Sequence, residues 1–147
     1  MLQEYLKLNK NILIAFAASI VISAMIAQIL SDQKDYLNTT YTTIADYVVY
    51  FSIFSGLFYL DNRKKYRLKS GGINSVKLRH DLKKLITSLG IAEVVYTAVR
   101  WALQYYLLTI EYDPYLASIA SQGMSTIIYM AVVNLSVKIT RLYKDGN

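Results

Sequence analysis

The sequence predicts an all-α integral membrane protein, a four-helix bundle built of two helical hairpins with both termini in the cytoplasm. Three observations support this prediction. Of the 147 residues, 54% are hydrophobic, and the mean hydropathy is +0.29. Four apolar runs fall within about 17–25 residues, the length that crosses a bilayer as a helix. Lys and Arg concentrate at the two ends and in the middle of the chain. We therefore expect a single membrane domain over residues 1–147.

The predicted spans are residues 12–30, 44–60, 85–108 and 116–139, and residues 61–84 form a basic cytoplasmic loop. The first span follows Lys7 and Lys10, as a signal peptide would, but its apolar run is longer than a secretory signal needs. Small residues recur every four positions along it. These are Ala15, Ser19, Ser23 and Ala27. Such a strip lets a second helix approach closely, so we assign it to helix packing.

The segments around the second span are polar. Residues 31–43 are expected to form a loop, with Asp46 at the outer end of the span that follows. In the central loop, Ser70-Gly71-Gly72 is a flexible break. Ser75 is suited to cap a helix that starts at Val76 and continues into the third span. His80 lies in this basic helix and is expected to be solvated rather than a metal ligand.

The third span carries a polar stripe inside its apolar run. Its members are Glu93, Tyr96, Thr97, Arg100 and Gln104. A charge at bilayer depth costs about 2.5–3.5 kcal/mol on insertion scales, so such residues face a partner, a cavity or water. In one interpretation Glu93 and Arg100 bind each other or polar groups of neighbouring helices, and fix the packing. In the other they line a path or a head-group pocket, with Arg100 against a phosphate. The sequence leaves both open.

The only proline, Pro114, is placed to start the helix of the fourth span, which also carries polar residues. Gln122 and Tyr129 share a face, and Asn134 lies deeper. We expect these three to donate or accept hydrogen bonds between helices.

Charge and composition narrow the partners. Nine of the sixteen Lys and Arg residues lie between Arg63 and Lys84, which indicates a cytoplasmic loop facing anionic lipids rather than a nucleic-acid site. The chain has no Cys and one His. It shows no nucleophile–base arrangement, metal-ligand spacing or phosphate-binding glycine loop, so we expect no enzyme activity, cofactor or metal.

The two hairpins resemble the GtrA-like family of small four-span membrane proteins. The likeness lies in YYLLTIEYDPYLASIASQGMSTIIYMAVVNLSVKITR, residues 105–141, with its late Asn134, and in FYLDNRK, residues 58–64. The chain lacks the Gly-rich opening of that family's first span. The resemblance implies work with polyprenyl-phosphate-linked sugars in cell-surface polysaccharide or glycoprotein assembly.

Three functions follow as hypotheses. The first is a non-enzymatic carrier or flippase component for such lipid-linked sugars, with Arg100 near the phosphate, in the cell (plasma) membrane. The second is an accessory or structural subunit of a larger membrane enzyme complex. Either would form homo-oligomers or bind other membrane subunits. A proton-coupled exporter is disfavoured, because Arg100 is expected to offset the only acid embedded in the membrane.

Overall fold

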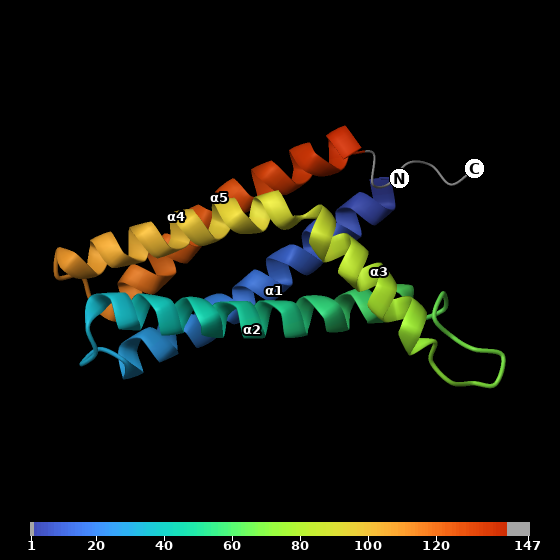
Figure 1. The fold of residues 1–147 in the computed structure, drawn as a ribbon, viewed down its shortest axis with the longest axis horizontal. Coiled ribbons are helices and arrows are strands. Elements are labelled where there is room, and N and C mark those ends of the chain that lie inside the picture. Colours follow the sequence, from blue (N-terminus) through green and yellow to red (C-terminus); the bar gives the residue numbers. More distant parts are fainter. Residues whose placement is uncertain (1, 141–147) are drawn as a thin grey trace.

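The computed structural model describes residues 2–140, except the side chains of residues 88 and 136–140. These residues form five helices (Figure 1). They are α1 (Leu2–Ile29), α2 (Asp35–Asn62), α3 (Ser75–Ser88), α4 (Gly90–Thr109) and α5 (Pro114–Thr140). The all-α prediction is confirmed. The basic C-terminal residues 141–147, which support the predicted orientation, lie outside the described part of the chain.

Three of the helices, α1, α2 and α5, are long and apolar enough to cross a membrane. The consecutive helices α3 and α4 pass the same test only when taken together, and they are bent by 58° at the break between them. Large apolar side chains face outward on the long helices, where Val21 is 59%, Val48 62% and Ile127 73% exposed. Such exposure is costly in water and favourable in lipid, so these surfaces indicate a membrane protein.

Four of the helices form a closed ring of contacts (Figure 1). α1 contacts α2 and α5, and α4 contacts the same two helices, so that each long helix has two neighbours. α3 diverges from this group and contacts α4. The α1–α2 and α4–α5 turns lie at one end of the molecule, and the N-terminus and α3 lie toward the other.

The second helix begins at Asp35, so the prediction of a polar loop over residues 31–43 was wrong for most of its length. Asn38 explains the difference, because its Nδ2 donates to the carbonyls of Ala27 (2.9 Å) and Leu30 (3.0 Å) at the end of α1. Thr39 satisfies its hydroxyl by donating to the main-chain oxygen of Asp35, one turn back. The polar residues can therefore form the first turns of α2, because nearby main-chain oxygens accept the hydrogen bonds of their side chains.

The predicted third span is not one continuous helix in the structure. α3 ends at Ser88, and the N–H of Leu89 donates to Leu85 and Ile86 before α4 begins at Gly90. The predicted cap was also off by one residue: Oδ1 of Asn74, rather than Ser75, accepts from the N–H of Lys77 at 3.1 Å.

The small-residue strip of α1 faces inward as predicted. Ala15, Ser19, Ser23 and Ala27 are all fully buried. α1 contacts both α2 and α5, and this strip gives their backbones room to approach.

A volume increase on this strip should destabilise the packing. We expect Ala15→Leu to lower the free energy of unfolding by about 1–3 kcal/mol, because the added carbons have no space among buried neighbours. Ala17→Leu is the matched control, since Ala17 is exposed on the same helix and should change little. Thermal unfolding of both variants in detergent measures the difference, and equal melting temperatures would contradict the assigned packing.

Candidate functional site

The interior holds two polar networks, the first of which is built on an ion pair between α2 and α4. Nε of Arg100 lies 2.8 Å from Oδ2 of Asp46, and the two side chains are 0% and 1% exposed. Nη1 of Arg100 also donates to Gln104 on its own helix. Longer contacts of 3.4–3.5 Å join the guanidinium to Thr43, Ser118 and Gln122. The guanidinium is thus enclosed by protein groups.

The carboxylate of Asp46 is enclosed in the same way. Its Oδ1 accepts from Nε2 of Gln122 at 2.9 Å, and its Oδ2 accepts from the hydroxyl of Tyr96. Nε2 of Gln122 also donates to Oγ of Ser19 at 2.7 Å, which brings α1 into the network. The Asp46–Arg100 network therefore joins all four long helices and carries no net charge.

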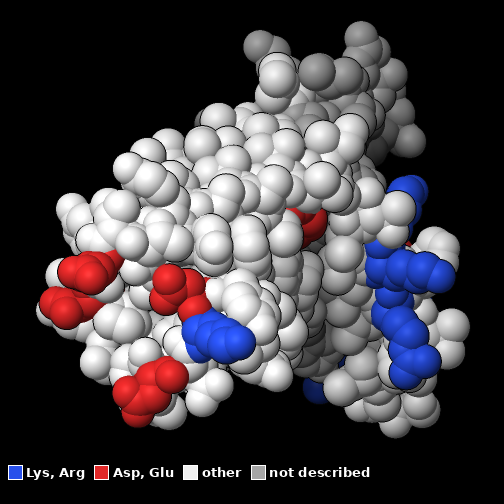
Figure 2. Space-filling model, turned by 60° about the vertical axis from the view of Figure 1, so that its left-hand side comes forward, with Lys and Arg blue, Asp and Glu red and all other residues white. Residues whose placement is uncertain are grey.

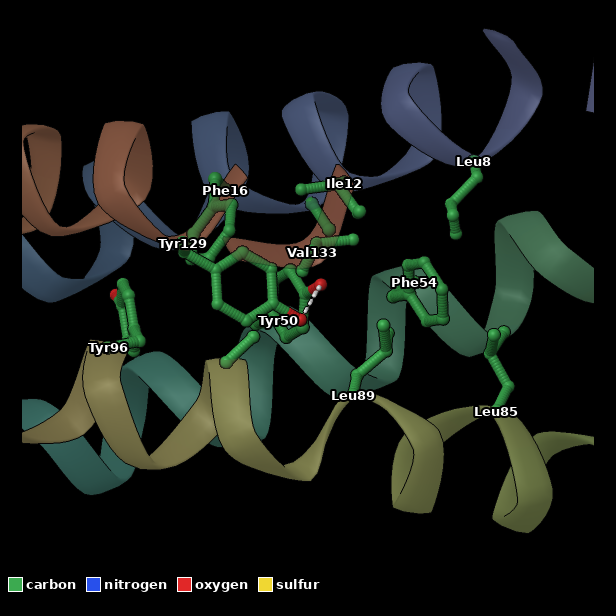
Figure 3. Close-up of a cluster of buried hydrophobic side chains, with 12 residues drawn as sticks. Leu8, Ile12, Phe16, Tyr50, Phe54, Leu85, Leu89, Tyr96, Tyr129 and Val133 are labelled. Atoms are coloured by element: carbon green, nitrogen blue, oxygen red, sulfur yellow. Dashed lines mark hydrogen bonds between the residues drawn. The ribbon is translucent and has the colours of Figure 1, made fainter. Parts of the chain in front are cut away.

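The second network surrounds Glu93. The hydroxyl of Tyr129 donates to Oε1 of Glu93 at 2.7 Å, and it lies 3.4 Å from the hydroxyl of Tyr50 (Figure 3). The hydroxyl of Tyr47 donates to the main-chain oxygen of Glu93 at 3.2 Å and also contacts the hydroxyl of Thr97. This network joins α2, α4 and α5, and its charge is that of one carboxyl group.

The predicted stripe on the third crossing faces inward. Tyr96, Arg100 and Gln104 are buried, and Glu93 and Thr97 are partly buried. Glu93 and Arg100 do not pair with each other. Each binds polar groups of neighbouring helices instead. This is the arrangement that the sequence allowed as the alternative to direct pairing of Glu93 with Arg100.

The three polar residues expected to bond between helices on the predicted fourth span all do so. Gln122 contacts Arg100, and Tyr129 binds Glu93. Asn134 exchanges hydrogen bonds of 3.0 and 3.1 Å with Asn9 of α1, so it also joins two helices but does not reach the stripe.

Sequence reasoning missed the role of Asp46. It was placed at the outer end of its span, whereas it is buried well inside the helix that Asp35 begins. The expectation that Arg100 offsets the only embedded acid was therefore wrong, because the acid it offsets is Asp46 and not Glu93. A usable signal existed: a buried guanidinium requires an anion at its own depth, and Asp46 lies in the apolar run of the second helix.

A pocket of about 340 Å³ lies at the other end of the interior, between α1, α2 and α3. Its polar lining comprises Glu4, Lys7, Asn11, Asp61, Asn62, Lys65, Asp81 and Lys84, and its apolar lining Leu8, Phe54, Phe58 and Leu85. Asn11 is buried and donates to Asp61 at 3.0 Å, but its Oδ1 has no hydrogen-bond partner. An unpaired buried acceptor is costly.

Charge balances within this pocket. Nζ of Lys65 lies 2.9 Å from Oδ2 of Asp81. Lys10 reaches Asp61 at 3.4 Å. Asp61 and Asp81, two of the three acids that line the pocket, are therefore already engaged by ammonium groups.

The two ends of the molecule differ in charge. Acidic side chains gather at the end with the two helical turns, and basic side chains at the opposite end (Figure 2). The turns carry Asp32, Asp35, Glu111 and Asp113 beside Lys34. The wall between the two ends is mainly uncharged in this view.

Comparison of the chain with protein-family models, curated proteins and solved structures gives no match.

The buried ion pair leads to a prediction about stability. Asp46→Ala should cost about 3–5 kcal/mol, because it leaves the Arg100 charge buried without an anion. The double variant Asp46→Ala/Arg100→Met should recover most of that loss, since it removes both charges. Lys10→Ala, which breaks a pair whose Lys10 side chain is 51% exposed, should cost about 1 kcal/mol or less. Denaturant titration in detergent gives all three values. A double variant no better than Asp46→Ala would refute the pairing.

Proposed function

We propose that the protein is a non-enzymatic carrier or flippase component for polyprenyl-phosphate-linked sugars in cell-surface glycan assembly. The observation that carries the proposal is the pocket at the basic end, where ammonium, amide and carboxylate groups stand beside apolar side chains. A glycosyl phosphate on a lipid chain has the matching parts: an anion, hydroxyl groups and a hydrocarbon tail.

The proposal includes a topology. The four crossings would be α1, α2, the α3–α4 pair and α5, arranged as two hairpins in the plasma membrane with both termini cytoplasmic. The charge difference between the ends supports this orientation, since cytoplasmic segments carry the excess of Lys and Arg.

The phosphate contact is assigned to the basic-end pocket rather than to Arg100. Arg100 is fully enclosed and contacts five side chains, so we give it a structural role. Lys7 lines the pocket from α1 and is exposed, which leaves its ammonium accessible to a head group at the membrane surface. Lys is a common phosphate ligand that acts as a point charge.

Translocation of a fluorescent polyprenyl-phosphate sugar in proteoliposomes tests this function. Lys7→Ala should weaken apparent affinity about tenfold or more, because a charge-assisted hydrogen bond contributes about 1.5–3 kcal/mol. Lys69→Ala is the matched control, since Lys69 is exposed on the central loop and does not line the pocket. Absence of translocation by the unmodified protein would refute the function. Equal effects of the two variants would refute the assigned contact.

An accessory subunit of a larger membrane enzyme complex is the second candidate. It is favoured by the closure of the Asp46–Arg100 network, which leaves the guanidinium no room for a ligand, and by the apolar outer surface available to neighbouring subunits. Purification in a gentle detergent followed by native mass spectrometry distinguishes the two. Stoichiometric foreign chains are expected for the subunit, whereas the protein alone or its homo-oligomer contradicts it.

A further inference from the structure

Glu93 lies at the middle of the molecule rather than near either end. Its hydrogen-bond partner Tyr129 is close to the midpoint of α5, and Tyr50 is close to the midpoint of α2. Phe16, at the midpoint of α1, packs against both rings with centroid distances of 4.5 Å to Tyr50 and 5.3 Å to Tyr129. Helices of this length cross the hydrocarbon core, so their midpoints define its centre.

No basic side chain in the described part of the chain forms an ion pair with Glu93. The ion pairs found there are Lys10–Asp61, Lys65–Asp81, His80–Asp81 and Arg100–Asp46. Arg100, on the same helix, is bound to Asp46 and lies two turns further along. The main-chain N–H of Glu93 is bonded to the carbonyl of Leu89.

The groups that face Glu93 are neutral hydroxyls or acids. α5 presents Tyr129, and α2 presents Tyr47, Tyr50 and, further off, the carboxylate of Asp46. α1 contributes the uncharged ring of Phe16 to this layer, and α4 itself carries Tyr96 and Arg100, both bound to Asp46. One tyrosine hydroxyl on a carboxylate does not balance its charge, and an uncompensated charge in an apolar interior is expensive.

We propose that Glu93 is a reversible proton-binding site at the centre of the membrane. Proton uptake converts its carboxylate to a neutral carboxylic acid and removes the charge, while the hydroxyl of Tyr129 continues to donate to Oε1. The Asp46–Arg100 network needs no such proton, because its charges cancel. This inference does not depend on the lipid-linked ligand. It also removes the argument against a proton-coupled exporter, which was that Arg100 offsets the charge of Glu93.

Infrared difference spectroscopy of the full chain in lipid vesicles, from mildly acidic to mildly alkaline pH, tests the proposal. The carbonyl band of a protonated carboxylic acid should appear reversibly on acidification and be lost completely in Glu93→Gln, which preserves size and an acceptor for Tyr129. Glu111→Gln is the matched control, because Glu111 is an exposed acid at a turn, and the band should persist. Tyr129→Phe should move the band to higher wavenumber, since it removes the hydrogen bond to the acid.

Several results would overturn the proposal. A band retained in Glu93→Gln, a Glu93 that stays ionised or stays neutral over the whole pH range, or a band that responds to Na⁺ at constant pH would each contradict it. If Glu93→Gln does not fold, labelling of the unmodified protein with dicyclohexylcarbodiimide decides instead. This reagent modifies protonated carboxyls in apolar surroundings. Mass spectrometry should locate the adduct on Glu93 and find it decreasing as pH rises, and no adduct at any pH would contradict proton binding.

Discussion

The ion pair between Asp46 and Arg100 is the constraint on which the packing of this protein depends. A guanidinium removed from water needs an anion and hydrogen-bond acceptors around its plane, and each must come from a surrounding helix. α2 supplies Asp46, α4 supplies Gln104, and α5 supplies Gln122, which in turn reaches Ser19 on α1. A rotation or shift of any one helix would leave a buried polar group unpaired. The network therefore selects one relative depth and rotation for the four helices.

The two polar networks differ in their net charge, which is the property that matters for function. The network of Asp46 and Arg100 is neutral and enclosed, so it suits a permanent structural role. The network of Glu93 has the charge of one carboxyl group and only tyrosine and threonine hydroxyls around it. The two meet on adjacent turns of α4, where Tyr96 binds Asp46 while its ring lies 5.7 Å from that of Tyr129. A change in the charge on Glu93 would thus act on side chains packed directly against the structural network.

The sequence predicted well those features that depend on one helix at a time. The apolar runs identified helices long and apolar enough to cross a membrane. The four-residue spacing of Ala15 and Ser19 identified a packing face, and the stripe through Arg100 identified an inward face. It failed where the answer depends on how deep two helices lie relative to each other. Periodicity places Glu93 and Arg100 on one face, but it cannot tell which of two acids, on different helices, lies level with the guanidinium. The start of α2 was missed for a similar reason, since Asn38 is satisfied by carbonyls of the preceding helix.

The apolar part of the core explains how the pocket and Glu93 can be separate sites. Leu8, Phe54 and Leu85 lie on the pocket side of the cluster, and Tyr96, Tyr129 and Phe16 on the far side, with Ile12, Leu89 and Val133 between (Figure 3). A proton or a head group entering at the basic end would have to pass these side chains to reach Glu93. Leu89 occupies the bend between α3 and α4, and Glu93 lies in the next turn. Leu89 therefore separates the pocket side of the core from the turn of α4 that carries Glu93.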